Sequence, residues 1–389
     1  TSDNRRVVFN IGDPALKLAI PKPKVVLTKI NGVNVNQPTD VLNALSYVTL
    51  SGEVQNSNNL ILPNYNGQLS VQIFDKNIQR QTLGNDGTLS GSGNLVIMDF
   101  VALGETIFRG NASVVNGKFE FGFVVPKDIK IAEGNGKVSF YAKSNIPNLQ
   151  DQTGYDFSIK IGGINLNAPE DNIAPIVKLY MNDQSFVYGG ITNESPFLLA
   201  YLEDENGINT ASGIGHDIVA ILDGDELNPY ILNDYYETEN NNYQKGNVRF
   251  PFKNLEPGLH SITFKAWDVY NNLITAEIQF VVVGADIITI SNVLNYPNPF
   301  VSYTEFWFNH NRPFEMLDVQ VQIFTISGKL VKTINQSFFT EGFLSRNLKW
   351  DGKDDFGDKI GKGVYVYKLI VKSSIDGKKS EKYEKLVIL

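Results

Sequence analysis

Cysteine is absent from the 389-residue sequence, which excludes a disulfide framework and a thiol nucleophile within these residues. Histidine is scarce, with only His216, His260 and His310. A zinc site needs three or four clustered ligands, and these residues are scattered, so we expect structural or surface roles for them. No Gly-x-Ser-x-Gly motif occurs either. We therefore predict no catalytic residue and no cofactor-binding residue in this sequence.

Long apolar runs and an excess of positive charge are also missing. No run approaches the 18 apolar residues of a transmembrane helix, so none is predicted. The formal net charge is −8 and the acidic residues are dispersed, which argues against nucleic-acid binding. The sequence begins Thr-Ser-Asp-Asn, without an initiator Met or a signal peptide. We expect a processed product or the C-terminal part of something longer.

What the sequence does contain is a long series of short alternating strands separated by Gly/Asn turns. Asn116-Gly117 lies between two alternating segments and predicts a hairpin, and Asn66-Gly67 predicts a second turn. Only residues 40–45 favour a helical turn. The predicted fold class is all-β, with tandem immunoglobulin-like β-sandwich domains and a small terminal sandwich. We expect sandwiches over residues 21–167, 168–285 and 286–389.

Acidic residues crowd the predicted loops of the second sandwich. Carboxylate oxygens on adjacent loops are the ligands that calcium prefers. The candidate metal ligands are Asp204, Glu205, Asp223 and Asp225. The same residues are also typical of solvated turns, and the sequence leaves both interpretations open.

The last quarter carries an ordered set of motifs. It has NYPNPF at residues 295–300, an alternating strand at 319–324 that leads into SGK at 327–329, and WDGKDDFGDK at 350–359. A second strand, VYVYKL, follows at 364–369. The two prolines force an extended segment, the glycine of SGK suits a hairpin turn, and Trp350 is a large apolar anchor before an Asx-turn loop. A small antiparallel sandwich is predicted.

This order of motifs resembles the C-terminal sorting domain of the type IX secretion system of Bacteroidetes. The segment Gly12-Asp13-Pro14-Ala15-Leu16 resembles the tail of a gingipain-like cysteine peptidase domain, so residues 1–20 are expected to be such a tail. Segments at 190–196, 212–218 and 265–272 resemble the type IX secretion sortases. The resemblance spans essentially the whole sequence.

The resemblance implies the C-terminal scaffold of a cell-surface sortase, associated with the outer membrane. The family's peptidase removes the sorting domains of secreted cargo and attaches the cargo to lipopolysaccharide. Its catalytic Cys and His lie upstream and have no counterpart here, so the sequence alone does not decide whether this chain is an enzyme. The implied partner is an outer-membrane β-barrel protein (PorV-like). The residues expected to dock it are Tyr296, Phe300, Trp350, Tyr365, Tyr367 and Leu386.

Other interpretations stay open. The final basic strand at 378–389 has lysines that protect a sheet edge from aggregation, or it docks a partner by adding a strand to it. The chain is alternatively a cargo protease or adhesin whose sorting domain is removed. A third interpretation is a calcium- or carbohydrate-binding sandwich.

Overall fold

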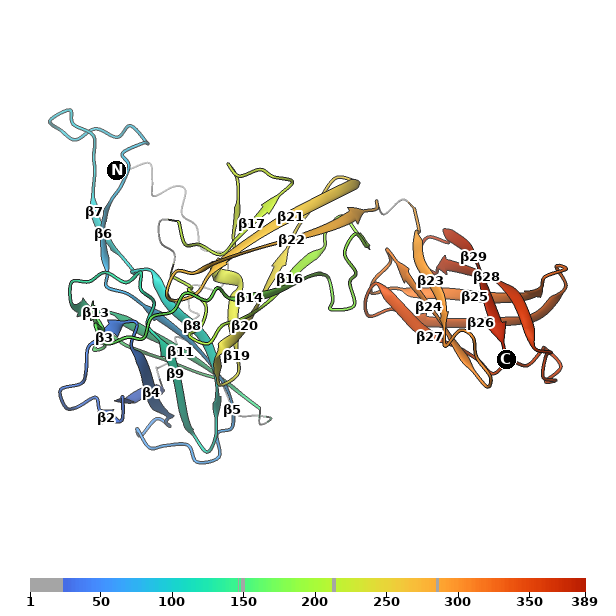
Figure 1. Cartoon of the computed structure of the whole chain (residues 1–389). Helices are drawn as coiled ribbons and strands as arrows, with labels where there is room; N and C mark the ends of the chain where they lie inside the picture. Colours follow the sequence, from blue (N-terminus) through green and yellow to red (C-terminus); the bar gives the residue numbers. More distant parts are fainter. Residues whose placement is uncertain (1–23, 146, 148–150, 212–214, 285–286) are drawn as a thin grey trace, which may run out of the picture. The chain divides into compact units, whose positions relative to one another are not determined.

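The computed structural model describes residues 24–145, 147, 151–211, 215–284 and 287–389. The expected peptidase tail at 1–20 and residues 212–214 of one sortase-like segment lie outside these ranges. Over the described ranges every regular element is a β-strand, apart from the single-turn 3₁₀ helix η2 (Asn233–Tyr235), as predicted for an all-β chain (Figure 1). None of the described residues belongs to a helix with the length and apolar character needed to cross a membrane.

The chain divides into two compact units. One holds the residues up to Val125 together with Ile129–Leu166, and the other holds Pro126–Asp128 together with Asn167–Leu389. The division after Leu166 lies one residue from the expected boundary. The second unit contains two separate hydrophobic cores, one within residues 181–282 and one within 288–388. A domain boundary near residue 285 stays a prediction.

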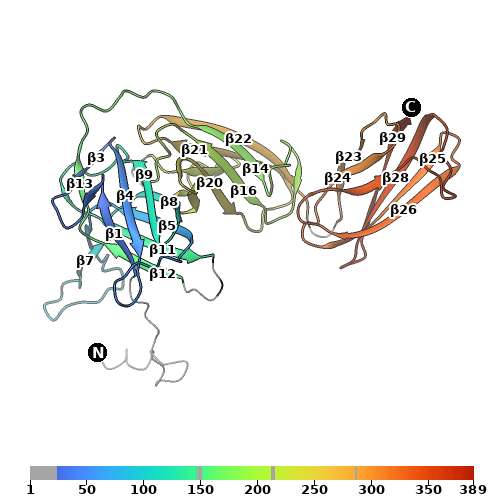
Figure 2. The same cartoon turned by 90° about the horizontal axis from the view of Figure 1, so that it is seen from below.

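The first unit is built on two four-stranded sheets (Figure 2). One has the order β2 (Val33–Asn34), β1 (Val25–Ile30), β4 (Tyr47–Val54), β9 (Lys118–Val124). The other has the order β12 (Gln152–Asp156), β11 (Lys137–Ser144), β5 (Gly67–Phe74), β8 (Thr106–Val114). A third sheet has the order β10 (Gly134–Asn135), β13 (Lys160–Ile164), β3 (Leu42–Ala44).

The two four-stranded sheets share an aromatic core because their strands alternate. In β9, Phe119, Phe121 and Phe123 are buried and their intervening neighbours are not. Phe108 of the other sheet stacks on Phe123, with ring centroids 4.3 Å apart, and Phe140 lies 5.3 Å from Phe119. Inward-facing side chains of two sheets that interdigitate in this way define a β-sandwich.

Turn chemistry was predicted correctly at one Asn-Gly pair and wrongly at the other. Asn116 and Gly117 have φ of 52° and 74° and close a two-residue hairpin between β8 and β9. Gly67 instead begins β5, where a Cβ would lie 1.9 Å from the Lys143 carbonyl oxygen. This glycine permits a close approach of two backbones rather than a turn. The expected helical turn at residues 40–45 is also wrong, because Leu42–Ala44 pair with β13 as a strand.

A two-stranded ribbon extends from the first sandwich (Figure 1). It consists of β6 (Ile78–Gln81) and β7 (Asp99–Ala102), and a long loop joins them. Its apolar side chains are exposed: Leu83 is 82% accessible, Met98 61% and Val101 56%. The ribbon therefore contributes little to the core of its unit.

The second sandwich lies in the second unit. One sheet has the order β14 (Ile176–Met181), β16 (Phe197–Glu203), β20 (Asn242–Pro251), β19 (Tyr236–Glu239). The other has the order β15 (Ile191–Thr192), β22 (Leu273–Val282), β21 (Gly258–Trp267), β17 (Val219–Leu222), β18 (Tyr230–Ile231). Alternate residues of β16, β21 and β22, among them Leu198, Phe264 and Phe280, fill the core. The strand predicted from residue 216 begins later, at Val219.

The terminal domain is a smaller sandwich, again with two sheets. One has the order β23 (Ile290–Tyr296), β24 (Thr304–His310), β27 (Leu344–Trp350). The other has the order β26 (Leu330–Phe339), β25 (Met316–Thr325), β28 (Gly363–Ser373), β29 (Lys379–Ile388). Both predicted strands, at 319–324 and 364–369, lie within longer strands of the second sheet. Gly328 has φ of 85° in the turn that joins β25 to β26, as the SGK motif predicts.

Candidate functional site

Three aspartates from separate loops of the second sandwich lie together. Asp171 precedes β14, Asp204 follows β16, and Asp268 follows β21. One carboxylate oxygen from each lies within 4.8 Å of the other two. Asp204 and Asp268 are buried, with 6% and 0% of their surface accessible, and Asp171 is partly buried. We call these three residues the Asp171 cluster.

Local turns hold the three carboxylates in place. Asp204 Oδ1 accepts hydrogen bonds from the backbone N–H groups of Asn206 and Gly207, at 2.8 and 3.0 Å. Asp268 Oδ1 accepts from the N–H groups of Tyr270 and Asn272. These are Asx turns, in which a short acidic side chain caps the loop that follows it.

An asparagine on each loop then links the cluster together. Asn206 Nδ2 donates to Asp171 Oδ2 at 2.8 Å. Asn272 Nδ2 donates both to Asp268 Oδ2 and to the carbonyl oxygen of Asp171. The cluster therefore joins the segment before β14 to the loops that follow β16 and β21.

Burial dominates the electrostatics of the cluster. Desolvation raises the pKa of Asp204 to about 6, and the neighbouring charges of Asp268 and Asp171 act in the same direction. The pKa of Asp268 is raised for the same first reason. Backbone N–H donors oppose both shifts. Like charges placed this close in a desolvated site need either a proton or a cation to neutralise them.

Of the four residues predicted as metal ligands, only Asp204 lies in this cluster. Glu205 follows it, and its carbonyl oxygen accepts a hydrogen bond from Gln244. Asp223 lies near the beginning of β21, at the opposite end from Asp268, and its carboxylate binds the His260 ring and the Ser261 N–H. Asp225 caps a turn through the Leu227 N–H. Asp223 and Asp225 therefore do not share a site with Asp204.

The sequence analysis missed Asp171 and Asp268 as candidate ligands. Asp171 lies in a polar segment before the first strand of its sandwich, where nothing in the sequence distinguishes it from a linker residue. Asp268 belongs to the Trp-Asp-Val-Tyr-Asn-Asn segment, whose Asp and Asn residues indicate a turn. The one available signal that Asp268 is buried was its position. It follows the buried Ala266 by two residues and so lies on the same side of the strand.

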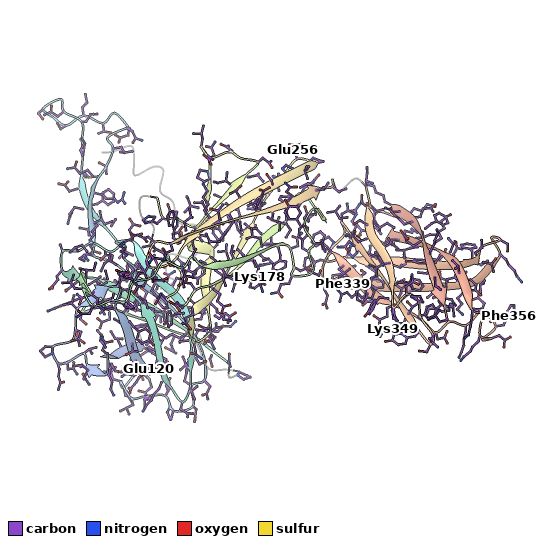
Figure 3. All side chains as sticks on the ribbon, in the orientation of Figure 1. Glu120, Lys178, Glu256, Phe339, Lys349 and Phe356 are labelled. Carbon is purple, nitrogen blue, oxygen red and sulfur yellow. The ribbon has the colours of Figure 1, made fainter. Side chains whose placement is uncertain are left out.

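The three histidines have structural partners. Nδ1 of His216 lies 2.7 Å from Asp128 Oδ2, and Nδ1 of His260 lies 2.7 Å from Asp223 Oδ2. The second ring nitrogen of His260 faces the carbonyl oxygen of Glu256, which is labelled in Figure 3. His310 is fully buried, with Nε2 3.0 Å from Ser345 Oγ. Across the described ranges, the only group of three or more candidate metal ligands is the Asp171 cluster.

Most of the residues expected to dock a partner lie in the core of the terminal domain. Phe300, Trp350, Tyr367 and Leu386 are at most 3% accessible, so their side chains do not face a partner in this structure. Phe300 packs edge-on against Trp350, with ring centroids 5.5 Å apart. The predicted anchor role of Trp350 agrees with the structure, since its Nε1 donates to the Lys353 carbonyl at 2.8 Å.

Two of the predicted docking residues keep accessible surface. Tyr296 is 61% accessible at the end of β23, and Tyr365 is partly buried, with its hydroxyl donating to the Gly361 carbonyl. Both can contact a partner directly.

The terminal domain also presents an open sheet edge. β29 pairs with β28 along its length and stands at the end of its sheet. Phe300 covers its last residues, through hydrogen bonds to Val387 and Leu389. The stretch before them carries Lys379 and Lys382 on a strand that is mostly exposed, whereas the Lys385 carbonyl accepts from Asn298 Nδ2. Lysines on an edge strand oppose uncontrolled pairing but still permit pairing with an acidic or polar partner strand.

The described residues thus define an all-β chain of tandem sandwiches that contains an acidic cluster and ends in a sandwich with an open edge. In sequence it is similar to PorU from Porphyromonas gingivalis, whose crystal structure is that of a dimeric latent form. The identity is 30% over 97% of this chain, and the TM-score is 0.42. The chain spans about a third of the PorU chain, 35% of its length.

Other solved structures match at much lower sequence identity. Fibronectin type III-like modules of CbhA from Clostridium thermocellum match 55% of this chain and 93% of their own, at 8% identity and a TM-score of 0.22. Part of a bacterial ice-binding adhesin matches 95% of this chain and 99% of its own, at 10% identity and a TM-score of 0.20. These likenesses are too weak to bear on function. No protein-family model matches the chain, and no curated protein sequence does.

Proposed function

We propose that this chain is the C-terminal scaffold of a cell-surface sortase of the type IX secretion system. In this role it links a gingipain-like cysteine peptidase domain upstream to a β-barrel partner in the outer membrane. The peptidase would cleave the sorting domains of secreted cargo and attach the cargo to lipopolysaccharide. The observation that carries the proposal is the 30% identity to PorU over 97% of the chain.

The terminal domain supplies the docking surface in this proposal. Because four of the predicted docking residues are buried, we assign the contact to Tyr296 and to the open edge of β29. These two features are neighbours, since Asn298 Nδ2 donates to the Lys385 carbonyl of β29 at 3.1 Å. An exposed aromatic ring beside an unpaired strand edge suits a partner that adds a strand and packs a side chain against the ring.

The test is co-purification of the barrel partner from solubilised outer membranes with tagged full-length protein. We expect deletion of residues 287–389 to abolish co-purification and Tyr296→Ser to weaken it several-fold. Phe356→Ser is the matched control, because Phe356 is 92% accessible on a loop next to β26, at the opposite edge of the sheet (Figure 3). Undiminished co-purification of the deletion variant would contradict the docking role.

A second measurement separates the scaffold from processed cargo. We expect mass spectrometry of the cell-surface protein to detect peptides from residues 287–389 in the same amount as peptides from the rest of the chain. Their absence, with a mature end near Ile290, would show that the terminal domain is removed and would favour the cargo alternative.

A further inference from the structure

The Asp171 cluster has a composition that nothing in the fold itself requires. Three carboxylates from three segments meet, and two of them are buried. Within the described ranges none of the three forms an ion pair with Lys or Arg. The other ionisable groups near the cluster are Tyr236, Tyr270 and Glu205, whose charge acts on Tyr270 together with those of Asp171 and Asp268, and none of them is basic. Since burial of unneutralised like charge is strongly unfavourable, the arrangement calls for a positive ligand.

A second feature near the cluster also lacks a partner. Tyr236 is 1% accessible, and its hydroxyl has no hydrogen-bond partner. Buried tyrosine hydroxyls normally find one, so an unpaired hydroxyl indicates a water or ion that completes the site.

The direction of the Tyr236 ring follows from the strand register. Tyr236 pairs with Val248, yet its ring lies over Gly246, where a Cβ would be 2.4 Å from the hydroxyl oxygen. Gly246 pairs with Leu202, and the next inward residue along that strand is Asp204. The ring therefore runs toward the Asp204 end of the sheet and directs its hydroxyl to the cluster. Gly246 leaves the space that this position needs.

The chemistry of the candidate ligands indicates which cation the cluster would bind. The three candidate ligands are carboxylates, which offer oxygen, whereas zinc prefers His and Cys. The carboxylates come from loops, which suits the larger and more variable coordination shell of calcium better than the strict octahedron of magnesium. Asp204 Oδ1 is occupied by two backbone N–H donors, so its Oδ2 is the oxygen that faces a ligand.

We infer that Asp171, Asp204 and Asp268 bind one calcium ion, which fastens the segment before β14 to the loops after β16 and β21. Water completes the coordination shell, and the Tyr236 hydroxyl donates to one of these waters. Sites of this kind on extracellular modules bind calcium with dissociation constants on the order of 10⁻⁴–10⁻³ M. This inference does not depend on the proposed sortase role.

The experiment is isothermal titration of the full 389-residue chain with calcium chloride at pH 7.5, after removal of metal with EDTA. We expect one ion per chain and a rise of several degrees in melting temperature in millimolar calcium, with a smaller rise in magnesium. Asp171→Asn should weaken this binding at least ten-fold. Its amide oxygen can still accept from the Ile173 N–H, whereas its amide nitrogen cannot accept from Asn206 Nδ2. Asp225→Asn is the control and should bind as the wild type does.

Terbium luminescence gives a test that needs no variant. Trp267 and Tyr270 flank Asp268, so a lanthanide in the cluster should emit when these rings are excited, and calcium should quench the emission by displacement. The inference is overturned if wild-type protein shows neither calcium heat nor displaceable terbium emission, or if Asp171→Asn binds with unchanged affinity. A melting temperature that rises between pH 7 and pH 5 and does not respond to calcium would also overturn it, because the carboxylates would then share protons.

Discussion

His310 is a neutral imidazole inside the terminal domain. Its Nδ1 accepts a hydrogen bond from the Arg312 N–H, so Nε2 carries the proton and donates to Ser345 Oγ. Burial lowers the pKa of His310 to about 4, and the charge of Asp183 opposes this shift only weakly. The unfolded chain keeps the ordinary value of about 6.5. Between these values the unfolded state binds the extra proton.

This difference makes the terminal domain sensitive to acid. Below about pH 6.5 the free energy of unfolding should fall, by about 3 kcal/mol in all by pH 4, through this one group. We expect His310→Gln to flatten that fall relative to wild type in urea titrations followed by tryptophan fluorescence. Parallel pH curves for the two proteins would contradict the assignment.

His260 is a control, because its pKa is shifted in the opposite direction from that of His310. Burial lowers the pKa of His260, but hydrogen bonds to the Glu256 carbonyl and the Asp223 carboxylate raise it more, and the net shift is upward. Its stabilising contribution is therefore complete below about pH 6.5 and is lost as pH rises through the folded-state value. His260→Gln should remove stability at pH 6 and have less effect at pH 8.

At the scale of elements, the β6–β7 ribbon and β9 are opposite extremes in how much apolar surface they bury. Alternate residues of β9 fill the core of the first sandwich, whereas the ribbon leaves Leu83, Ile97 and Met98 more than half exposed. An element that buries little apolar surface adds little to stability, whatever its hydrogen bonds.

The loop of the ribbon should therefore be removable. Thr82 N donates to the Met98 carbonyl at 3.0 Å, so Asn-Gly in place of residues 83–97 closes a two-residue hairpin. We expect the melting temperature to stay within about 2 °C of wild type in differential scanning fluorimetry. Phe121→Ala is the comparison, and it should cost about 3–5 kcal/mol. A drop for the shortened loop comparable to that of Phe121→Ala would show that the ribbon packs on the core.

At the scale of the whole molecule, the second compact unit contains two hydrophobic cores, one within residues 181–282 and one within 288–388. If they are separate folding units, Phe264→Ala and Phe306→Ala should each weaken one core by about 3–5 kcal/mol and lower different transitions in calorimetry of the full chain. Lowering of a single common transition by both variants would show instead that the two cores unfold together.

The strands could be predicted wherever one face is buried, because period-two alternation in β21 and β25 follows directly from packing. Docking residues could not be predicted in the same way. Tyr365 and Tyr367 lie on one face of β28, yet only Tyr367 is fully covered, and that depends on the opposite sheet. The Asp171 cluster could not be predicted from local patterns either, because it brings together residues almost a hundred positions apart in the sequence.

The parallel pairing of β3 with β13 has a kinetic consequence. Ile161 stands opposite Leu42, and Asn43 Nδ2 donates to the Gly162 carbonyl, a contact between residues 119 positions apart. Closing so long a loop costs entropy before any contact compensates for it, so such pairings form slowly. Residues 42–44 therefore stay unpaired, with Leu42 and Ala44 exposed to water, until β13 has folded next to them. During that interval this short stretch is open to proteases and to non-native strand pairing.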